Sequence, residues 1–154
     1  MKRNKFLLFC LEKENYNLAE EKYSLEIESD PNKIIVVEEF VNYFAKDLKI
    51  DDEKIPGLIL AVTEATTNAI IHANKSDINK LVRVSAHMED GTLVISVKDQ
   101  GSGFDPNDVP DPTSPENLLK DSGRGIYLMR VYMDEIKYNV TQDGTELNLY
   151  MKVD

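Results

Sequence analysis

The sequence predicts an α+β fold, a two-layer α/β sandwich in which helices cover one face of a mostly antiparallel sheet. Three observations predict it. Segments with alternating apolar residues outnumber segments with helical periodicity, and four of them form two local pairs. A long stretch rich in proline and glycine interrupts the second half of the chain, as the lid of a binding site does. With 154 residues, the chain has the length of one ordinary domain.

The first strand and the first helix of this domain are expected between residues 22 and 48. Residues 22–29 alternate apolar and polar side chains, as a half-buried strand does. Asp30 and Pro31 then form a helix-start signal, an N-cap followed by proline at the first helical position. Apolar residues continue at steps of three and four as far as Leu48, which predicts an amphipathic helix of about five turns.

A second helix is expected from about residue 52 to residue 74, with an apolar stripe that packs in the core. Glu64, Asn68 and His72 lie on a different stripe, because about 100° per residue advances a helix by about 40° every four residues. Ile71 falls about 20° from Glu64 around the helix, and an apolar residue beside this ridge favours a sheltered face over a solvated one. A packing helix gains nothing from an acid, an amide and a histidine in a row. The pattern therefore indicates a ridge that faces a ligand.

The remaining elements are two hairpins and a third helix. Residues 81–88 and 92–99 alternate, and the Asp-Gly pair between them is a strong hairpin signal. Residues 100–122 lose this regularity and are typical of a functional loop. A helix is then expected over residues 125–136, followed by a closing hairpin over residues 136–153.

The end of the predicted strand at residues 92–99 carries an acid followed by two glycines. Asp99 ends the strand, where its carboxylate can accept a hydrogen bond from an amino group. Gly101 and Gly103 after it let a flat ligand approach the backbone. Alone, this Asp-x-Gly-x-Gly pattern also fits an ordinary turn.

A second glycine pair opens the last helix. Gly123 and Gly125 flank Arg124, and unblocked backbone N–H groups at a helix start favour an anion such as phosphate. Arg124 adds a cation there, although it also fits a solvated surface charge. Gly144-Thr145 in the last hairpin is by itself only a turn.

Composition excludes several classes of function. A formal charge of −10 argues against a general nucleic-acid or acidic-membrane binder, because both need a positive field. The single cysteine cannot form an internal disulfide, which fits a reducing cytoplasm. The sequence has no P-loop, Rossmann glycine motif, zinc-binding Cys/His set or segment of membrane-spanning length.

The order of these motifs resembles the GHKL superfamily of ATP-binding domains. "EATTNAIIHA" resembles its N box, "DQGSGF" its first glycine box and "GRGIYLM" its second. The likeness implies a Bergerat (histidine-kinase-like ATPase) fold with an ATP lid, in a domain at residues 22–154. Residues 1–21 are then an N-terminal extension, in which the apolar run at residues 5–12 predicts a further short strand.

The resemblance also implies bound ATP and Mg²⁺ and gives each motif residue a role. Asn68 would coordinate the Mg²⁺ that bridges the phosphates, and Glu64 would be the general base for the attacking hydroxyl. Asp99 would accept a hydrogen bond from the adenine amino group. The other implied site residues are Gly101 and Gly103 at the adenine, Thr145 in the same hydrogen-bond network, and Gly123, Arg124 and Gly125 near the phosphates. His72 is also implied, although it fits a phosphate or ribose contact and a packing histidine equally well.

Within the superfamily, the chain most resembles the bacterial anti-sigma-factor serine/threonine kinases. This implies a cytoplasmic, ATP-dependent protein kinase of a partner-switching system. Its substrate would be a Ser or Thr of a STAS-domain antagonist, and it would sequester an RNA polymerase sigma factor without touching nucleic acid or membrane. A homodimer is implied by the resemblance alone.

Two alternatives stay open at this point. One is a non-catalytic ATP-binding scaffold, against which Glu64 argues because nucleotide binding alone needs no base. The other is a kinase of a stress-signalling pathway that has no sigma factor as a partner. A sensor histidine kinase is disfavoured, because the sequence has only two histidines and no spare length for a dimerisation hairpin.

Overall fold

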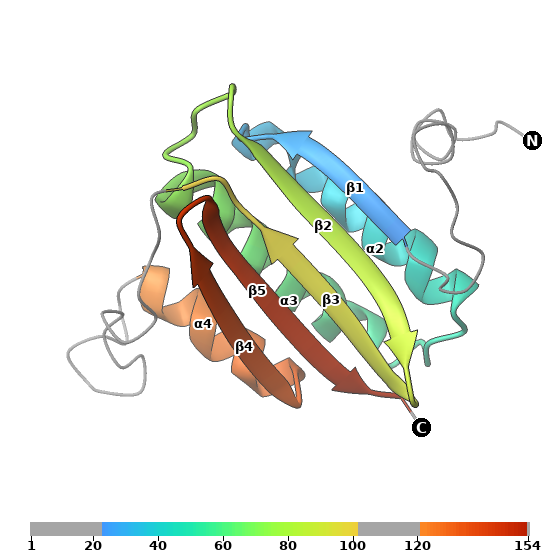
Figure 1. The fold of residues 1–154 in the computed structure, drawn as a ribbon. Coiled ribbons are helices and arrows are strands. Elements are labelled where there is room, and N and C mark those ends of the chain that lie inside the picture. Colours follow the sequence, from blue (N-terminus) through green and yellow to red (C-terminus); the bar gives the residue numbers. More distant parts are fainter. Residues whose placement is uncertain (1–22, 102–120, 154) are drawn as a thin grey trace, which may run out of the picture.

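The computed structural model describes residues 23–101 and 121–153 and arranges them as a two-layer α+β sandwich. A five-stranded sheet forms one layer, and the helices α2, α3 and α4 lie together behind it in Figure 1. This arrangement confirms the predicted fold class. The strand expected at residues 5–12 and residues 102–120 of the expected lid, Gly103 among them, lie outside the described residues.

Every neighbouring pair of strands in the sheet is antiparallel. The spatial order is β1-β2-β3-β5-β4, so each predicted hairpin supplies two adjacent strands. The strands are β1 (Tyr23–Glu28), β2 (Leu81–Glu89), β3 (Thr92–Lys98), β4 (Glu135–Thr141) and β5 (Gly144–Lys152). Because Lys98 pairs with Glu146, the end of β3 lies beside the start of β5.

The helical layer follows the predicted starts. Asp30 caps the first helical segment, because its Oδ1 accepts a hydrogen bond of 2.9 Å from the N–H of Asn32, and Pro31 takes the first helical position. The predicted helix start is confirmed. The helical elements are the 3₁₀ turn η1 (Pro31–Lys33), α2 (Ile34–Asp47), α3 (Ile55–Asn68), the π-helical turn η2 (Ala69–Ala73) and α4 (Asp121–Tyr132).

The hydrophobic core lies between the sheet and the helices. Phe40 and Phe44 of α2 stack edge to face inside it, with ring centroids 5.2 Å apart. The predicted apolar stripe of α3 is buried along its whole length, which confirms the expected packing face. Its members are Ile55, Leu58, Val62 and Ala65, and the stripe continues in Ala69 of η2.

Helices α3 and α4 approach closely because α3 carries a glycine at the contact. A Cβ atom on Gly57 would lie 2.3 Å from Cδ1 of Tyr132, well inside van der Waals contact. The ring of Tyr132 therefore occupies the space that a side chain at position 57 would need. This contact anchors the C-terminal end of α4 on the start of α3.

The Asp-Gly turn between β2 and β3 forms as predicted. Asp90 and Gly91 both have positive φ, 48° and 75°, as a two-residue type I′ hairpin requires. The turn fixes the register in which Glu89 pairs with Thr92. Side chains of the two strands therefore alternate between the core and the open face of the sheet.

Two predicted helix ends are wrong in detail. The last helix covers Asp121–Tyr132, and not residues 125–136, because the N–H of Asp134 already donates to the carbonyl of Tyr150 in the sheet. The second helix ends in the wider η2 turn, where the N–H of Asn74 donates to the carbonyl of Ala69 five residues earlier. None of the helices in the described part of the chain has the length and apolar character needed to span a bilayer.

Candidate functional site

Glu64 and Asn68 lie one turn apart on α3, beneath the N-terminal part of α4. Both side chains are half-buried. A Cβ atom on Gly125 would lie 2.8 Å from Oε2 of Glu64 and 3.4 Å from Nδ2 of Asn68, so the backbone of α4 rests directly on the pair. Neither side chain makes a hydrogen bond within the described residues. The two polar groups are therefore sheltered and available to a ligand.

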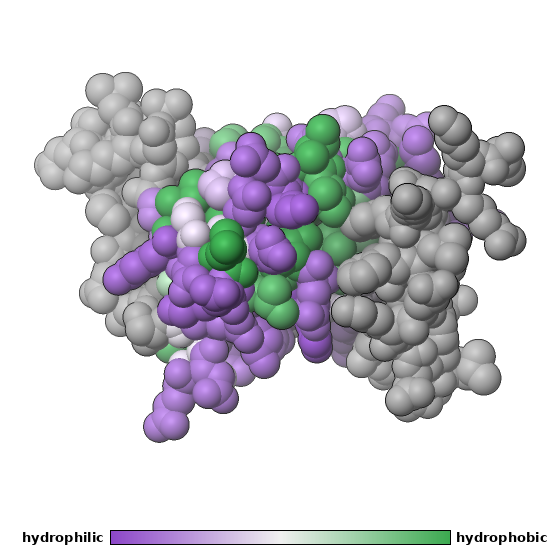
Figure 2. All heavy atoms as spheres, turned by 90° about the horizontal axis from the view of Figure 1, so that it is seen from above, coloured by the Kyte–Doolittle hydropathy of each residue, from purple (hydrophilic) through white to green (hydrophobic). Residues whose placement is uncertain are grey.

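The third member of the predicted ridge, His72, is not sheltered with the other two. It lies in η2 and is exposed, which does not support a packing histidine. Ile71 is also 40% exposed, so it does not shield Glu64 and Asn68 as expected; the cover comes from α4. Figure 2 looks down on this end of the molecule and shows hydrophobic residues scattered among hydrophilic ones.

Asp99 follows β3 and is buried, with 6% of its surface exposed. Its Oδ1 accepts two backbone hydrogen bonds of 3.0 Å, one from the N–H of Gly101 and one from the N–H of Thr145. The N–H of Asp99 donates in turn to the carbonyl of Thr145 at 3.0 Å. The carboxylate is thus fixed at the junction of β3 and β5, and its Oδ2 has no partner in residues 23–101 or 121–153.

Thr145 contributes a second unpartnered group at the same junction. Its Oγ1 is buried and makes no hydrogen bond within the described part of the chain. A buried hydroxyl without a partner costs about 1–3 kcal/mol, so the position calls for a ligand group or a water. Gly144 allows this close approach, because a Cβ atom there would lie 2.0 Å from the carbonyl oxygen of Asp99. Its φ of 141° is also one that other residues rarely adopt.

The remaining described glycines of the predicted site, Gly101 and Gly123, lie in different elements. A Cβ atom on Gly101 would lie 2.5 Å from the carbonyl oxygen of Ala73, so the turn after β3 packs on the end of η2. Gly123 and Arg124 belong to the first turn of α4, which starts two residues before the predicted glycine pair. The described site therefore has two parts: the Glu64–Asn68 pair, and the junction formed by Asp99 and Thr145.

Sequence reasoning missed two residues that build this site. Gly144 received no weight, because its closeness to Asp99 is not visible along the chain. The sequence pattern predicts Asn74 only as the end of a helix, yet it is fully buried and hydrogen-bonded to the turn after β3. An asparagine that closes an otherwise apolar helix end was the only available signal.

Comparison with known proteins decides the family. A model of the histidine kinase-like ATPase domain matches residues 27–151. The chain belongs to this family. The match begins in β1 and ends in β5, so this ATPase domain takes in nearly all the described elements. The resemblance drawn from the N box and the two glycine boxes is confirmed.

Two relatives of the ATPase domain carry informative names. Serine-protein kinase RsbW of Bacillus licheniformis is 33% identical over 121 residues, which are 75% of this chain and 76% of that protein. Anti-sigma F factor of Geobacillus stearothermophilus is 36% identical over 97 residues, 60% of this chain and 65% of that protein. This second alignment thus spans just under two thirds of the relative.

Solved structures share the fold. The structure of the RsbU and RsbW domains of a Mycobacterium tuberculosis protein superposes with a TM-score of 0.64 at 17% identity, over 86% of this chain and 32% of that chain. The histidine kinase domain of a blue-light activated histidine kinase from Erythrobacter litoralis gives a TM-score of 0.53 at 17% identity, over 97% of this chain and 70% of that chain. At these identities the likeness shows the fold alone.

The groups of the site suit the ATP that an ATPase domain binds. Oγ1 of Thr145 and Oδ2 of Asp99, which have no partner among the described residues, suit the polar edge of a base. No cluster of three or more His, Cys, Asp or Glu side chains within the described residues could hold a metal alone. A Mg²⁺ ion bound through one protein oxygen, phosphates and water needs no such cluster, and the amide of Asn68 can supply that oxygen.

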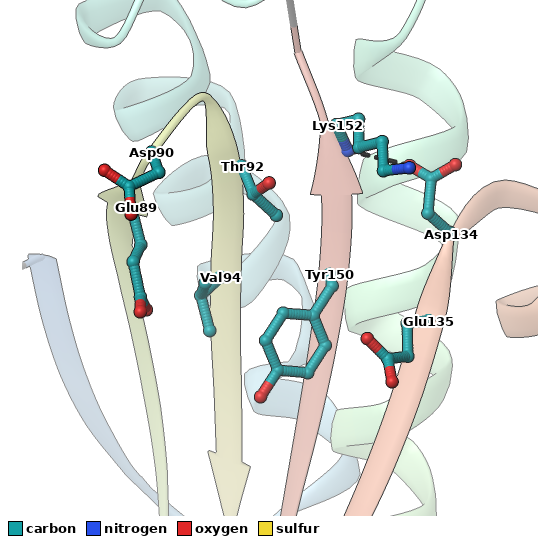
Figure 3. A pocket seen from close by; sticks show the side chains of 8 residues that line it. All are labelled: Glu89, Asp90, Thr92, Val94, Asp134, Glu135, Tyr150 and Lys152. Carbon is teal, nitrogen blue, oxygen red and sulfur yellow. Dashed lines mark hydrogen bonds between the residues drawn. The ribbon is translucent and has the colours of Figure 1, made fainter.

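The pocket drawn in Figure 3 is a different place from this site. It lies on the open face of the sheet, where Tyr150 and Val94 are surrounded by Glu89, Glu135 and Lys152. It sits at the opposite end of β3 and β5 from Asp99 and Thr145, about 20 Å away along the strands. The acidic side chains around this pocket do not by themselves identify a ligand, so we assign it no function.

Proposed function

We propose that this chain is an ATP- and Mg²⁺-dependent serine/threonine protein kinase. The observation that carries the proposal is the Glu64–Asn68 pair beneath Gly125, in a chain of the histidine kinase-like ATPase family. An amide that binds a metal needs no carboxylate beside it, whereas phosphoryl transfer to a hydroxyl benefits from a base at that place. The relative named serine-protein kinase RsbW supports the same reading.

In the proposed reaction, Asn68 holds Mg²⁺ through its amide oxygen and so positions the phosphates against α3. When bound, Mg²⁺ neutralises charge on the transferred group. Glu64 takes the proton of the substrate hydroxyl while that oxygen bonds to the γ-phosphorus. The bond from the γ-phosphorus to its bridging oxygen breaks, and ADP leaves. The backbone of α4 at Gly125 shields the pair from water.

At the other end of the proposed site, Asp99 reads the adenine. Its Oδ1 is held by two backbone N–H groups, so Oδ2 stays oriented to accept from the adenine amino group. Thr145 supplies its buried hydroxyl to the same edge. The proposal also places Gly101 and Gly103 at the base, Gly123, Arg124 and Gly125 near the phosphates, and His72 at the exposed rim.

The proposed partners are a STAS-domain antagonist, phosphorylated on Ser or Thr, and an RNA polymerase sigma factor held until the unphosphorylated antagonist competes. The relative named anti-sigma F factor supports this assignment. A net charge of −10 suits a protein-binding module that leaves DNA contact to its partner. We place the reaction in the cytoplasm and assign it to a domain at residues 22–154. We also propose that the protein forms a homodimer, which light scattering can measure.

Incubation with γ-labelled ATP and a candidate STAS-domain antagonist tests the kinase. Label is expected on a Ser or Thr of the antagonist with wild-type protein and not with Glu64→Gln. ATP binding without transfer to any antagonist of the same genome would favour the non-catalytic scaffold. Co-purification with sigma factors, with and without ATP, then separates an anti-sigma factor from a kinase of another pathway.

A further inference from the structure

Asn74 lies at the end of η2 and is fully buried, although its side chain is polar. Its amide has three partners. Nδ2 donates to Oγ of Ser29 at 2.8 Å and to the carbonyl oxygen of Leu81 at 3.2 Å, and Oδ1 accepts from the N–H of Gln100 at 2.9 Å. One carboxamide therefore joins the end of β1, the start of β2 and the turn after β3 to the helix that carries Glu64.

Further contacts tighten the same junction. The side chain of Gln100 returns to the sheet, where its Oε1 accepts from the N–H of Leu81 at 2.7 Å. On the next residue, Gly101 packs so closely on the carbonyl of Ala73 that no side chain would fit. The turn that carries Asp99 is thus held against η2 by the amide of Asn74 on one side and by backbone contact on the other.

The backbone bends sharply to bring Asn74 into this position. The N–H of Asn74 donates to the carbonyl of Ala69 across a π-helical turn. Lys75 and Ser76 then both adopt positive φ, 54° and 55°, which costs free energy for residues other than glycine. Such conformations persist where surrounding contacts outweigh their cost. The contacts here include the three hydrogen bonds of the Asn74 side chain and the N–H of Ser76, which donates to the carbonyl of Ile70 at 2.8 Å.

We propose that Asn74 is a positioning residue for the nucleotide, whose buried amide sets the distance between the phosphate end and the adenine end of the site. The inference rests on the proposed function. Asn68 lies six residues before Asn74 on the same helical segment, and Asp99 immediately precedes the residue that Asn74 binds. ATP has a limited span, so the affinity for a nucleotide that engages both Asn68 and Asp99 depends on the separation of the two elements.

Titration calorimetry of Asn74→Ala with Mg-ATP, below the melting temperature, tests the inference. We expect the affinity to fall about tenfold or more at unchanged stoichiometry, since the folded fraction still binds one nucleotide at a looser site. Amide exchange at Gln100 and Gly101 should accelerate in the nucleotide-free variant, because the N–H of Gln100 loses its acceptor. A merely destabilised fold would weaken binding only in proportion to its unfolded fraction, which circular dichroism at the titration temperature measures, so a folded variant would keep the wild-type affinity.

A matched control and a milder variant complete the test. Asn148→Ala removes a half-buried asparagine that is hydrogen-bonded to Ser96 on the open sheet face, and it should bind ATP as the wild type does. Ser29→Ala removes one partner of Asn74 and keeps the bond to Gln100, so it should weaken ATP binding less than Asn74→Ala does. If Asn74→Ala does not fold, Ser29→Ala must still weaken ATP binding measurably.

The two proposals fail in different ways. Affinity within twofold of the wild type in folded Asn74→Ala, or in Ser29→Ala if the first variant does not fold, would overturn the positioning role alone. Absence of ATP binding by the wild-type protein would overturn the proposed function, and with it the role of Asn74.

Discussion

The backbone N–H of Thr145 donates a 3.0 Å hydrogen bond to Oδ1 of Asp99, so the start of β5 and the end of β3 share one buried carboxylate. The N–H of Gly101 donates to the same oxygen. Oδ2 of Asp99 and Oγ1 of Thr145 have no partner within residues 23–101 and 121–153, and we propose that both face the base. Because one group is an acceptor and the other a hydroxyl, they can be tested separately.

Asp99→Asn should weaken ATP binding by about 1–3 kcal/mol, the cost of leaving a buried group without its hydrogen bond. The variant keeps an oxygen for the two backbone donors but presents an NH₂ group to the adenine amino group, and two donors cannot pair. Calorimetric titration with Mg-ATP measures the loss. Asp134→Asn is the matched control, because Asp134 binds the N–H of Lys152 at the far end of the sheet. Equal affinities for Asp99→Asn and the control would move the adenine elsewhere.

Thr145→Val should change stability and binding in opposite directions. Removing a buried hydroxyl without a partner should leave the free energy of unfolding of the nucleotide-free protein unchanged or raise it by up to about 1 kcal/mol. ATP affinity should fall by about 0.5–1.5 kcal/mol. Urea unfolding and calorimetry measure the two effects.

Thr66→Val is the control for Thr145→Val. Thr66 is also buried, but its hydroxyl donates to the carbonyl of Val62 at 2.7 Å. Its loss should lower the free energy of unfolding by about 0.5–1.5 kcal/mol. If Thr145→Val destabilised the nucleotide-free protein as much as Thr66→Val does, the hydroxyl of Thr145 would already be satisfied within the fold.

Asn68→Ala should abolish Mg-ATP binding, because among the described residues the proposed site offers the metal this one amide oxygen and no acidic cluster. Titration with ATP in the presence of Mg²⁺ and of a chelator measures the effect. Asn42→Ala, an exposed asparagine of α2, serves as the control and should bind normally. Unchanged affinity of Asn68→Ala would remove Asn68 from the metal site.

Glu64→Gln should bind ATP normally and transfer phosphate about 10²–10⁴-fold more slowly, the usual effect of losing a positioned base. Single-turnover transfer to the antagonist, at saturating ATP, measures the chemical step. Glu39→Gln on the exposed side of α2 is the control. Full turnover by Glu64→Gln would contradict the base role and leave Glu64 as a structural acid beneath α4.

Gly125→Ala should displace the carboxylate of Glu64, because its Cβ would lie 2.8 Å from Oε2. That oxygen ends a flexible side chain and can shift, so we expect a loss of stability below about 1 kcal/mol. In the Glu64→Ala background that oxygen is absent, so alanine should instead stabilise the helix by up to about 1 kcal/mol relative to glycine. Such non-additivity marks a direct contact, and a double-mutant cycle in urea measures it. Additive losses would mean that α4 rests on other atoms.

Local signals predicted most of the fold. The Asp30-Pro31 start, the Asp90-Gly91 turn and the buried stripe of α3 depend on neighbours close in sequence, and each forms as expected. The end of α4 was wrong because a hydrogen bond from Asp134 to Tyr150, in a strand further along the chain, ends the helix. No local pattern records that contact.

The candidate site was predicted by residue type and only partly by position. Glu64 and Asn68 share a sheltered face, but the shelter comes from Gly125 of a distant helix. Gly144 and Asn74 were missed for a similar reason. Their importance depends on Asp99 and Gln100, which reach them only after the sheet has formed.

The contact between Gly57 and Tyr132 has a consequence for how this domain can diverge. A side chain at the first position and a large ring at the second exclude each other, so the two positions can change only as a pair. A lineage that gains alanine at position 57 before it loses the ring passes through a weakened intermediate. Residues 57 and 132 should therefore vary together among related sequences, and the spacing of α3 and α4 should change only when both residues change.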